Sequence, residues 1–459
     1  MVFSSLAFIF LILPLFLICD SAARLVQSVP LRNLVLLTVS LFFYLWGEAA
    51  NVFLLFALGC LNYLAGLYIS RSRKPFLLAF CIALNLVPLI GYKYFHWLVS
   101  LFVADTNIRI SVMPLGISFF TFHAISYLID IYRNTIRPAK NSLDFLTYFC
   151  MFPHLVAGPI VRYAQVQTDL QTRGPSNDLY SYGIYRFLVG LNKKILIANP
   201  ASIIADEAFK LSVIGDLGCS DAWLGMIAYT VQIYFDFSGY SDMAIGLAAL
   251  AGFRFEENFR RPYSSTSIRE FWQRWHISLS SWFRDYLYIP LGGSRSSSLM
   301  TYRNLILVFF ICGLWHGANF TFIIWGLWHG LFLVLERIGS RFRIPSFPSW
   351  FCRVYTLLIV MIGWVFFRAP DLSHAAAYLG SLFSPSMDMT LDYYHSSLAA
   401  LSIGFLLCLI PDRLLPSVPD SHNPQFFTVP AYVFQIAFAV LSISLLVTGG
   451  RNPFIYFNF

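Results

Sequence analysis

Long apolar runs follow one another along most of the chain and are separated by short polar stretches. Many of them approach the about 20 residues that a helix needs to cross about 30 Å of hydrocarbon. Because lipid offers the backbone no hydrogen-bond partners, and because the alternating pattern of barrel strands is absent, these runs predict helices. We predict an all-α, multi-pass integral membrane protein with about ten to twelve membrane helices. The main runs are residues 33–46, 53–69, 76–90, 117–131, 223–235, 305–331, 351–367, 401–410 and 427–447.

The composition agrees with this pattern. Hydrophobic residues make up 58% of the 459 residues and charged residues only 12%, whereas an ordinary soluble domain is about 25% charged. A large soluble helical core would need charged outer faces, which the apolar runs lack. The sequence therefore argues against a soluble globular protein.

The positions of lysine and arginine predict the orientation in the membrane. Basic residues cluster at 24–32, 71–74 and 133–140, and all three clusters fall on one side of the predicted first spans. The positive-inside rule makes that side cytoplasmic and places the N-terminus outside. We therefore interpret the formal charge of +8 as a consequence of the membrane orientation rather than as a sign of nucleic-acid binding. The first spans are predicted near residues 3–19, 33–47, 52–70, 76–103 and 112–132.

A different pattern lies at residues 264–290. Serine and threonine can cap a helix here and Glu270 follows in its first turn, so we predict a helix from about Ser267. Its apolar residues recur at i, i+3, i+4 and i+7, which is typical of an amphipathic helix on or partly within the membrane. His276 shares the apolar face, either as a functional neutral imidazole or as a structural histidine bonded to a backbone carbonyl. The apolar residues are Phe271, Trp272, Trp275, Leu279, Trp282, Phe283 and Tyr286.

The apolar stretch 304–336 is long enough for a full span and a bend, and it contains Gly-Leu-Trp-His-Gly twice. In one unbroken helix His316 and His329 would differ by about 220°, so they could not line the same pocket. Small neighbours of His316, such as Gly313, permit close helix approach and suit an inward-facing functional group, and Asn319 follows one turn later. We interpret His329 as a hydrogen-bonded residue near a membrane boundary and prefer His316 as the functional histidine.

Residues 232–242 place Asp236 and Asp242 beside serines and a glycine in apolar surroundings. Gly239 and the neighbouring Ser238 are expected to loosen a helix here. The two carboxylates are compatible with an acid/base pair or a cation site, but we favour hydrogen-bonded scaffolding for a polar cavity. No His/Cys cluster or HExxH pattern suggests a metal site, and the eight cysteines are interpreted as small buried hydrophobes.

Several of these stretches together resemble the membrane-bound O-acyltransferase family, and within it the bacterial branch typified by the alginate O-acetylase. In this family the histidine of the Trp-His-Gly segment is regarded as catalytic, and it corresponds to His316. The histidine of the Trp-His-Ile-Ser-Leu-Ser segment is the second functional histidine, and it corresponds to His276. The matching stretches are MPLGISFFTFHAISYLIDIYR at 113–133, FPHLVAGPIVRY at 152–163, FDFSGYSDMAIG at 235–246, NFRRPYSSTSIREFWQRWHISLSSWFRDYLYIPLGG at 258–293 and GLWHGANFTFIIWGLWHG at 313–330.

The resemblance implies an O-acyltransferase, with acetyl as the expected acyl group. Family members enclose a tunnel or funnel that a donor enters from the cytoplasm and an acceptor from the opposite face. We expect His316 to act as general base or transient acyl carrier, and His276 to orient the acyl group or stabilise developing charge. The residues expected to line the site are Trp272, Trp275, Trp315, Asn319, Asp236 and Ser238.

The same resemblance implies the donor, the partners and the location. We expect no bound cofactor, acetyl-CoA or another acyl thioester as donor, and an exported polysaccharide or cell-wall polymer as acceptor. Periplasmic or extracellular partner proteins would complete the transfer from a bacterial inner membrane, with lipids around the chain and no nucleic acid. One membrane domain over residues 1–459 is predicted, with scaffold helices at 1–110, a catalytic core at 111–337, and C-terminal helices with an aromatic tail at 338–459.

A transporter or flippase is the alternative, because polar residues at membrane depth and broken helices also mark permeation paths. A coupled carrier would usually place Asp, Glu, Lys or Arg at its broken helices. Here the sharpest features are histidines set among tryptophans, which favours the acyltransferase.

The chain ends in an aromatic segment, residues 451–459, that is too short to span the membrane again. Aromatic rings bury much area at low conformational cost, so the segment fits either a headgroup anchor or a groove-bound tail. The resemblance favours a functional tail, because relatives carry similar segments near the place where acyl groups are handed on. Its aromatic residues are Phe454, Tyr456, Phe457 and Phe459.

Overall fold

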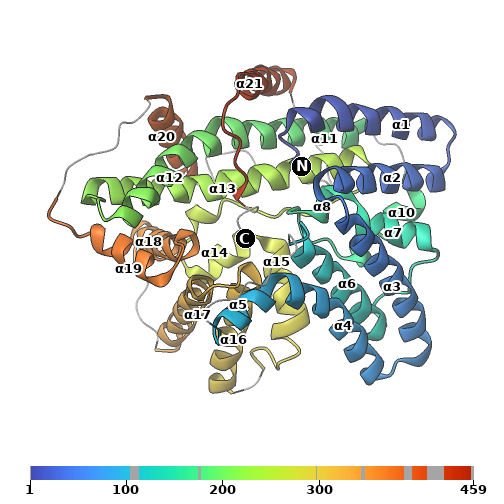
Figure 1. Ribbon diagram of the computed structural model, residues 1–459, viewed down its shortest axis with the longest axis horizontal. Helices are drawn as coiled ribbons and strands as arrows, with labels where there is room; N and C mark the ends of the chain where they lie inside the picture. The colour runs from blue at the N-terminus through green and yellow to red at the C-terminus, as the bar shows by residue number, and fades with distance from the viewer. Residues whose placement is uncertain are drawn as a thin grey trace. The chain divides into compact units, whose positions relative to one another are not determined.

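The structure, a computed structural model, describes residues 2–103, 113–173, 177–295, 297–342, 347–386, 395–410 and 428–455 (Figure 1). Within these ranges the regular elements are helices, so the predicted all-α, multi-pass membrane fold is confirmed. Nine helices of the described part are long and apolar enough to cross a membrane, fewer than the predicted count, because two further apolar helices, α6 (Ile117–Tyr132) and α20 (His395–Leu409), are shorter than a span. The nine are Phe8–Leu25, Val29–Glu48, Asn51–Ser72, Pro75–Ser100, Asn177–Ile214, Ser298–His316, Phe320–Arg341, Ser349–Arg368 and Val429–Val447.

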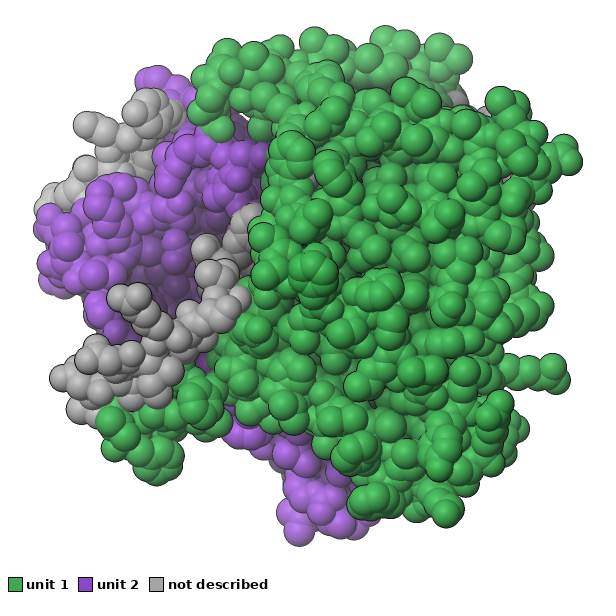
Figure 2. Space-filling model, turned by 45° about the vertical axis from the view of Figure 1, so that its right-hand side comes forward, with its two compact units in different colours: residues 1–191, 240–257, 419–450 green, residues 192–239, 258–418, 451–459 purple. Residues whose placement is uncertain are grey.

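The chain forms two compact units, which Figure 2 colours separately. Helix α13 (Cys219–Leu250) belongs to both, because the division falls within it. The predicted division into scaffold, catalytic core and C-terminal part stays a prediction. Unit 1 contains residues 1–191, 240–257 and 419–450, and unit 2 contains residues 192–239, 258–418 and 451–459.

Unit 1 begins with helices that follow the predicted first spans closely. Its helices are η1 (Phe8–Ile12), α1 (Leu13–Leu25), α2 (Val29–Glu48), α3 (Asn51–Ser72), α4 (Pro75–Leu89), η2 (Ile90–Tyr94), α5 (Phe95–Ser100), α6, α7 (Ser142–Cys150), α8 (Phe152–Leu155), α9 (Tyr163–Val166), α10 (Asp169–Thr172), α11 (Asn177–Asn192) and α21 (Val429–Val447). Ser28 caps α2, because its hydroxyl accepts a hydrogen bond from the backbone N–H of Leu31 at 3.3 Å. Inside α3 and α4 the amides of Asn62 and Asn85 bond each other in both directions, at 2.8 and 2.9 Å, and so join two apolar helices.

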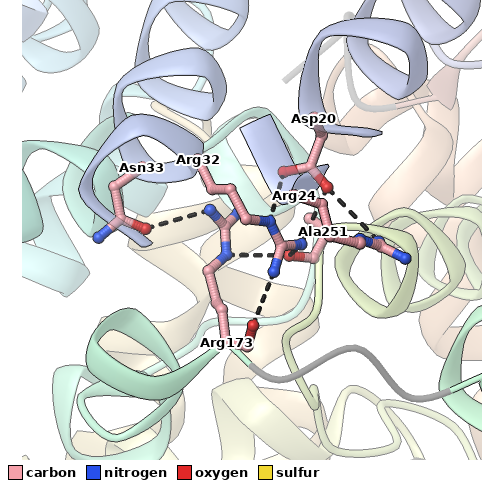
Figure 3. A network of polar contacts seen from close by, with 6 residues as sticks. All are labelled: Asp20, Arg24, Arg32, Asn33, Arg173 and Ala251. Carbon is pink, nitrogen blue, oxygen red and sulfur yellow. Dashed lines mark hydrogen bonds and ion pairs between the residues drawn. The ribbon is translucent and has the colours of Figure 1, made fainter. Parts of the chain in front are cut away.

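A buried polar network joins distant segments of unit 1 (Figure 3). Arg32 donates from Nε and Nη2 to the carboxylate of Asp20, at 3.0 and 2.9 Å, and from Nη1 to the carbonyl of Arg173 at 2.7 Å. Arg173 in turn donates to the carbonyl of Ala251 at 3.0 Å and to Oδ1 of Asn33 at 3.1 Å. The sequence counts Arg32 among the basic residues that set the orientation, and the structure shows that Arg32 also has a partner of opposite charge. Its guanidinium is buried and paired with Asp20, a partner that spacing along the chain does not reveal.

Unit 2 carries the candidate histidines. Its helices are η3 (Lys193–Ala198), α12 (Asn199–Ile214), η4 (Pro262–Ser264), α14 (Ile268–Arg274), α15 (Ile277–Phe283), η5 (Arg284–Tyr288), α16 (Ser298–His316), α17 (Phe320–Arg341), α18 (Ser349–Arg368), α19 (Leu372–Ser381) and α20. The predicted bend in the stretch 304–336 is confirmed, because α16 ends before Gly317, whose backbone is extended. Asn319 then caps α17, since its side chain accepts a hydrogen bond from the backbone N–H of Thr321 at 3.1 Å.

Helices α16 and α17 pack side by side as a hairpin. A Cβ atom on Gly313 would collide with the carbonyl group of Phe322, and one on Gly326 would collide with that of Phe309. Glycine is therefore required where the two backbones touch. Each copy of the repeated Gly-Leu-Trp-His-Gly supplies one of these glycines, which gives the repeat a packing role in addition to its histidines.

Candidate active site

The helix predicted from about Ser267 is confirmed at its start. The Ser267 hydroxyl accepts a hydrogen bond from the backbone N–H of Glu270 at 3.0 Å, and α14 begins at Ile268. The amphipathic pattern is also confirmed, since the apolar residues that define it are all buried while Arg269 and Arg284 are exposed. Burial of this face places His276 inside unit 2.

The expectation that one helix continues through His276 is wrong. Helix α14 ends at Arg274, and His276 adopts a left-handed backbone conformation (φ 43°, ψ 55°) before α15 begins. Its Cβ atom makes this conformation costly by about 1–2 kcal/mol. A segment 18 residues upstream of His276 offsets the cost, because the backbone N–H of Ile277 donates to the carbonyl of Asn258 at 3.0 Å and that of Arg260 donates to Arg274 at 2.9 Å. Local spacing does not show such a partner segment.

The imidazole of His276 is fully buried and held by the side chain of Asn258. Oδ1 of Asn258 accepts hydrogen bonds from the backbone N–H and the hydroxyl of Ser278, at 3.1 and 2.8 Å, so this atom is the amide oxygen. Nδ1 of His276 lies 3.2 Å from it and must donate, which leaves Nε2 as the nitrogen with the lone pair. Nε2 has no hydrogen-bond partner within the described residues. The expected bond to a backbone carbonyl is replaced by this side-chain bond.

The surroundings of His276 are apolar. Its ring packs edge-on against Phe237, with ring centroids 4.7 Å apart. Burial lowers the pKa of the imidazole to about 3, so the ring is neutral at pH 7. A neutral imidazole with one free lone pair can accept a hydrogen bond or a proton.

His316, the preferred candidate, is the last residue of α16 and is also buried. Its ring lies nearly perpendicular to Trp325 at a centroid distance of 4.8 Å. The indole of Trp315 lies 4.8 Å from the His316 ring and 6.4 Å from the His276 ring. The structure therefore brings both histidines of the resembled motifs to one tryptophan.

The interpretation of His329 as a hydrogen-bonded residue is wrong, and the condition of one unbroken helix is not met. The helix breaks between His316 and His329, so the comparison of their faces on one helix does not apply, and both rings approach Trp325, at 4.8 and 5.3 Å. His329 is not hydrogen-bonded either, since within the described residues neither of its ring nitrogens has a partner. Its ring is fully buried and lies perpendicular to that of Trp272 at 5.2 Å. It belongs to the aromatic core of the α16–α17 hairpin.

The expected loosening of the helix around Gly239 is absent. Helix α13 runs without a break through Ser238 and Gly239, and both residues are buried. A glycine costs a helix only about 1 kcal/mol relative to alanine, which close packing on all sides of α13 can outweigh.

Both carboxylates of this stretch have charged partners, as expected for scaffolding, whereas the polar cavity that they were expected to support stays a prediction. In unit 2, Asp236 forms an ion pair with Lys194 at 2.8 Å. In unit 1, Asp242 forms an ion pair with Arg186, which also pairs with Glu257 at 2.7 Å. Each carboxylate therefore pairs with its own cationic side chain, and the two do not form an acid/base pair.

Lys194 and Asp236 also hold the C-terminal tail, and we name this arrangement the tail clamp. The ammonium of Lys194 donates to the carbonyl of Pro453, and the carboxylate of Asp236 accepts from the backbone N–H of Ile455 at 2.9 Å. The side chains of Phe454 and Ile455 are buried. Further contacts join Asn199 to Asn452 at 3.4 Å and Asp206 to Arg451 at 3.7 Å.

The tail clamp decides between the two interpretations of the tail as far as the described residues reach. Phe454 and Ile455 are buried and held by unit 2, which favours a bound tail over a headgroup anchor for these two residues. Tyr456, Phe457 and Phe459, on which the prediction also rested, lie outside the described residues. The tail contacts Asp236 through Ile455. Phe237, which follows Asp236 in the chain, packs against His276.

Asp236→Ala is expected to lower the free energy of unfolding by about 3–5 kcal/mol, because it leaves the ammonium of Lys194 buried without its carboxylate. Thermal unfolding of the purified variant measures this loss. The double variant Asp236→Ala/Lys194→Met removes both charges and should recover most of the stability. If the double variant is as unstable as the single one, the lost bond to Ile455 rather than the lone charge explains the effect.

The remaining residues expected to line the site lie in different places. Trp275 is buried among aromatic rings next to His276 in the sequence, whereas Trp272 lies against His329. Asn319 caps α17, and Ser238 is buried within α13. Their roles in lining a site stay predictions.

The sequence analysis missed residues that contact the candidate site residues, and it missed two further buried histidines. Asn258 and Lys194 were overlooked because their partners are distant in the chain. In unit 1, His123 and His154 are fully buried with ring centroids 4.1 Å apart, and among the described residues the ring nitrogens of His123 have no hydrogen-bond partner. The only signal for them was their place in two of the resembled stretches, 113–133 and 152–163.

Known proteins resemble the chain over most of its length. It is 44% identical over 428 residues to the probable alginate O-acetylase AlgI of Azotobacter vinelandii, which covers 89% of this chain and 83% of the relative. It is 34% identical over 423 residues to the peptidoglycan O-acetyltransferase of Helicobacter pylori, covering 83% and 79%. It is 33% identical over 218 residues to the teichoic acid D-alanyltransferase of Bacillus subtilis, covering 44% and 53%. Because the model of the membrane-bound O-acyltransferase family also matches residues 139–374, the chain belongs to that family and is a multi-pass membrane O-acyltransferase.

Proposed function

We propose that the chain moves an acetyl group from a cytoplasmic thioester, such as acetyl-CoA, toward hydroxyl groups of an exported polysaccharide or cell-wall polymer. The observation that carries this proposal is the arrangement of His276, Trp315 and His316 in buried, aromatic surroundings. The relatives support the acceptor class, since their names refer to alginate, peptidoglycan and teichoic acid. The alternative of a transporter without acyl transfer gains no support from them.

The chemistry follows from a neutral imidazole in a water-poor site. His316 takes the proton of the acceptor hydroxyl while the oxygen attacks the thioester carbonyl, and the proton is passed to the departing thiolate. An oxygen–carbon bond forms and the carbon–sulfur bond breaks, so no cofactor is needed beyond the donor. His276, fixed in one tautomer by Asn258, orients the acyl group through Nε2. The apolar walls limit hydrolysis of the thioester, because they exclude water.

The proposed setting is a bacterial inner membrane with the N-terminus outside. Periplasmic or extracellular partner proteins would then receive the acyl group and complete its transfer to the polymer. The basic clusters at 71–74 and 133–140 support this orientation. A reporter enzyme that is active only in the periplasm, fused to the N-terminus, should be active, and an inactive but expressed fusion would reverse the orientation.

The proposed function is tested on the polymer itself. Cells that lack the gene are complemented with wild-type protein or with His316→Ala, and acetate released from the exported polymer by mild alkali is measured. Wild-type protein should restore alkali-labile acetate and His316→Ala should not. Equal acetate from both strains would mean that the chain does not perform the acyl transfer.

Asn258→Ala is expected to lower acyl transfer by about tenfold or more, because Nδ1 of His276 loses the acceptor that fixes its tautomer. Asn258→Asp keeps an oxygen acceptor for Nδ1 and should retain more activity than Asn258→Ala. Initial rates per folded protein, with folding checked by thermal unfolding, measure both variants. If the alanine and aspartate variants lose activity equally, Asn258 acts only through folding.

A further inference from the structure

A cavity of about 1030 Å³ lies in unit 2, at the ends of three candidate spans. Helix α16 begins there at Ser298, α17 ends there at Arg341, and α18 begins there at Ser349. His316 is at the opposite end of α16, about 27 Å along the helix axis. The cavity is therefore separate from His316, the proposed base.

Charge-assisted hydrogen bonds join the helices that frame the cavity. The carboxylate of Glu336 accepts from the backbone N–H groups of Ile268 and Arg269, at 2.7 and 3.2 Å, and so fastens α14 to α17. Nη1 of Arg341 donates to the hydroxyl of Ser298 at 2.7 Å and so fastens α17 to α16. These bonds join α14, α16 and α17 around the cavity.

The lining of the cavity is divided between charge and apolar surface. Its cationic side chains are Arg269, Arg337 and Arg341, which outnumber the single carboxylate of Glu336, and that carboxylate is already bonded to α14. Hydroxyl groups of serine and tyrosine accompany the arginines. Leucine and phenylalanine side chains, among them Leu333, supply apolar walls. A ligand that fits must therefore carry both a negative charge and apolar chains.

We propose that this cavity binds the phosphodiester headgroup of an anionic membrane phospholipid, with the acyl chains along the apolar walls. Arginine offers several donors to phosphate oxygens, and a basic pocket at the ends of membrane helices meets lipid headgroups at their own depth. A soluble phosphate compound would leave the apolar walls uncovered. A thioester donor held here by its phosphates would lie at the wrong end of α16 for His316.

The test compares retention of phosphatidylglycerol by the full chain in detergent, measured by native mass spectrometry over a range of lipid concentrations. We expect one tightly retained phosphatidylglycerol per chain and weaker retention of phosphatidylcholine. The double variant Arg269→Gln/Arg337→Gln should weaken retention of phosphatidylglycerol about 30-fold. Each arginine is expected to contribute about fivefold to the affinity, and the two factors multiply. Both side chains are exposed, so their replacement leaves the frame of the cavity in place.

The control variant, Arg71→Gln/Lys74→Gln, removes the same charge from exposed residues at the end of another span and should leave retention unchanged. An equal loss in both double variants would overturn the proposal in favour of diffuse attraction to basic residues. Equal retention of phosphatidylcholine would show an apolar groove without headgroup recognition. Displacement of phosphatidylglycerol by inorganic phosphate or by coenzyme A would assign the cavity to a soluble phosphate compound and would overturn the lipid site.

Discussion

Replacing His316 with alanine is expected to lower acyl transfer by about 10²–10⁴-fold, because the substitution removes the base that takes the proton of the acceptor. The variant should still insert and purify. The ring of His316 packs against Trp325 and Phe367 in the wild-type protein. Its removal is therefore expected to cause a modest loss of thermal stability alongside the loss of activity. Initial rates of acyl transfer at matched protein concentration measure the effect.

His329→Ala is the matched control, because His329 is also a buried histidine that packs against Trp325. The substitution removes the same ring from the same aromatic core and should keep measurable activity. Comparing the two variants separates loss of chemistry from loss of packing. An inactive His329 variant beside an active His316 variant would exchange the roles of the two histidines.

Shortening the tail is expected to lower acylation of the final polymer by about tenfold or more, and to affect consumption of the donor less. The reason is that the tail clamp holds Phe454 and Ile455 buried beside Asp236, whose neighbour Phe237 contacts His276. Deletion of residues 456–459 leaves every contact of the tail clamp in place. The tail clamp should therefore still hold Phe454 and Ile455 in this variant.

A second deletion, of residues 454–459, serves as the comparison for stability. It removes the buried side chains of Phe454 and Ile455 and the bond to Asp236, so it should lower the unfolding temperature as well. Polymer acylation by the shorter deletion that equals that of the full chain would leave the tail with a structural role only.

The fold was predictable because lipid permits few solutions. Apolar runs of about 20 residues must be helical in a membrane, and the predicted spans near 33–47 and 52–70 lie within α2 and α3. Helix caps were also predictable, because they depend on residues close together in the chain. At Ser267 the hydroxyl accepts a hydrogen bond from the backbone N–H three residues later. Burial of the amphipathic face followed from its spacing.

The parts of the site that depend on distant partners were not predictable. The left-handed backbone at His276 is stabilised by Asn258, and the charge of Arg32 is neutralised by Asp20. The tail clamp joins Asp236 to Ile455, more than 200 residues apart in the chain. Each case is a hydrogen bond or ion pair whose second residue is distant in the chain and is not indicated by any nearby pattern. The resemblance to a family, by contrast, did identify His276 and His316.

The central claim is that this chain is an enzyme that transfers acyl groups to hydroxyls with His316. The most direct measurement incubates labelled acetyl-CoA and the partner proteins with purified full-length protein in lipid nanodiscs, and compares samples with and without a polysaccharide acceptor. The account predicts that acetyl-CoA is consumed only when the acceptor is present, that label appears in an alkali-labile ester, and that His316→Ala abolishes both. Transfer at an unchanged rate by His316→Ala, or no labelled ester from the wild-type protein with acceptor and partner proteins present, would contradict it.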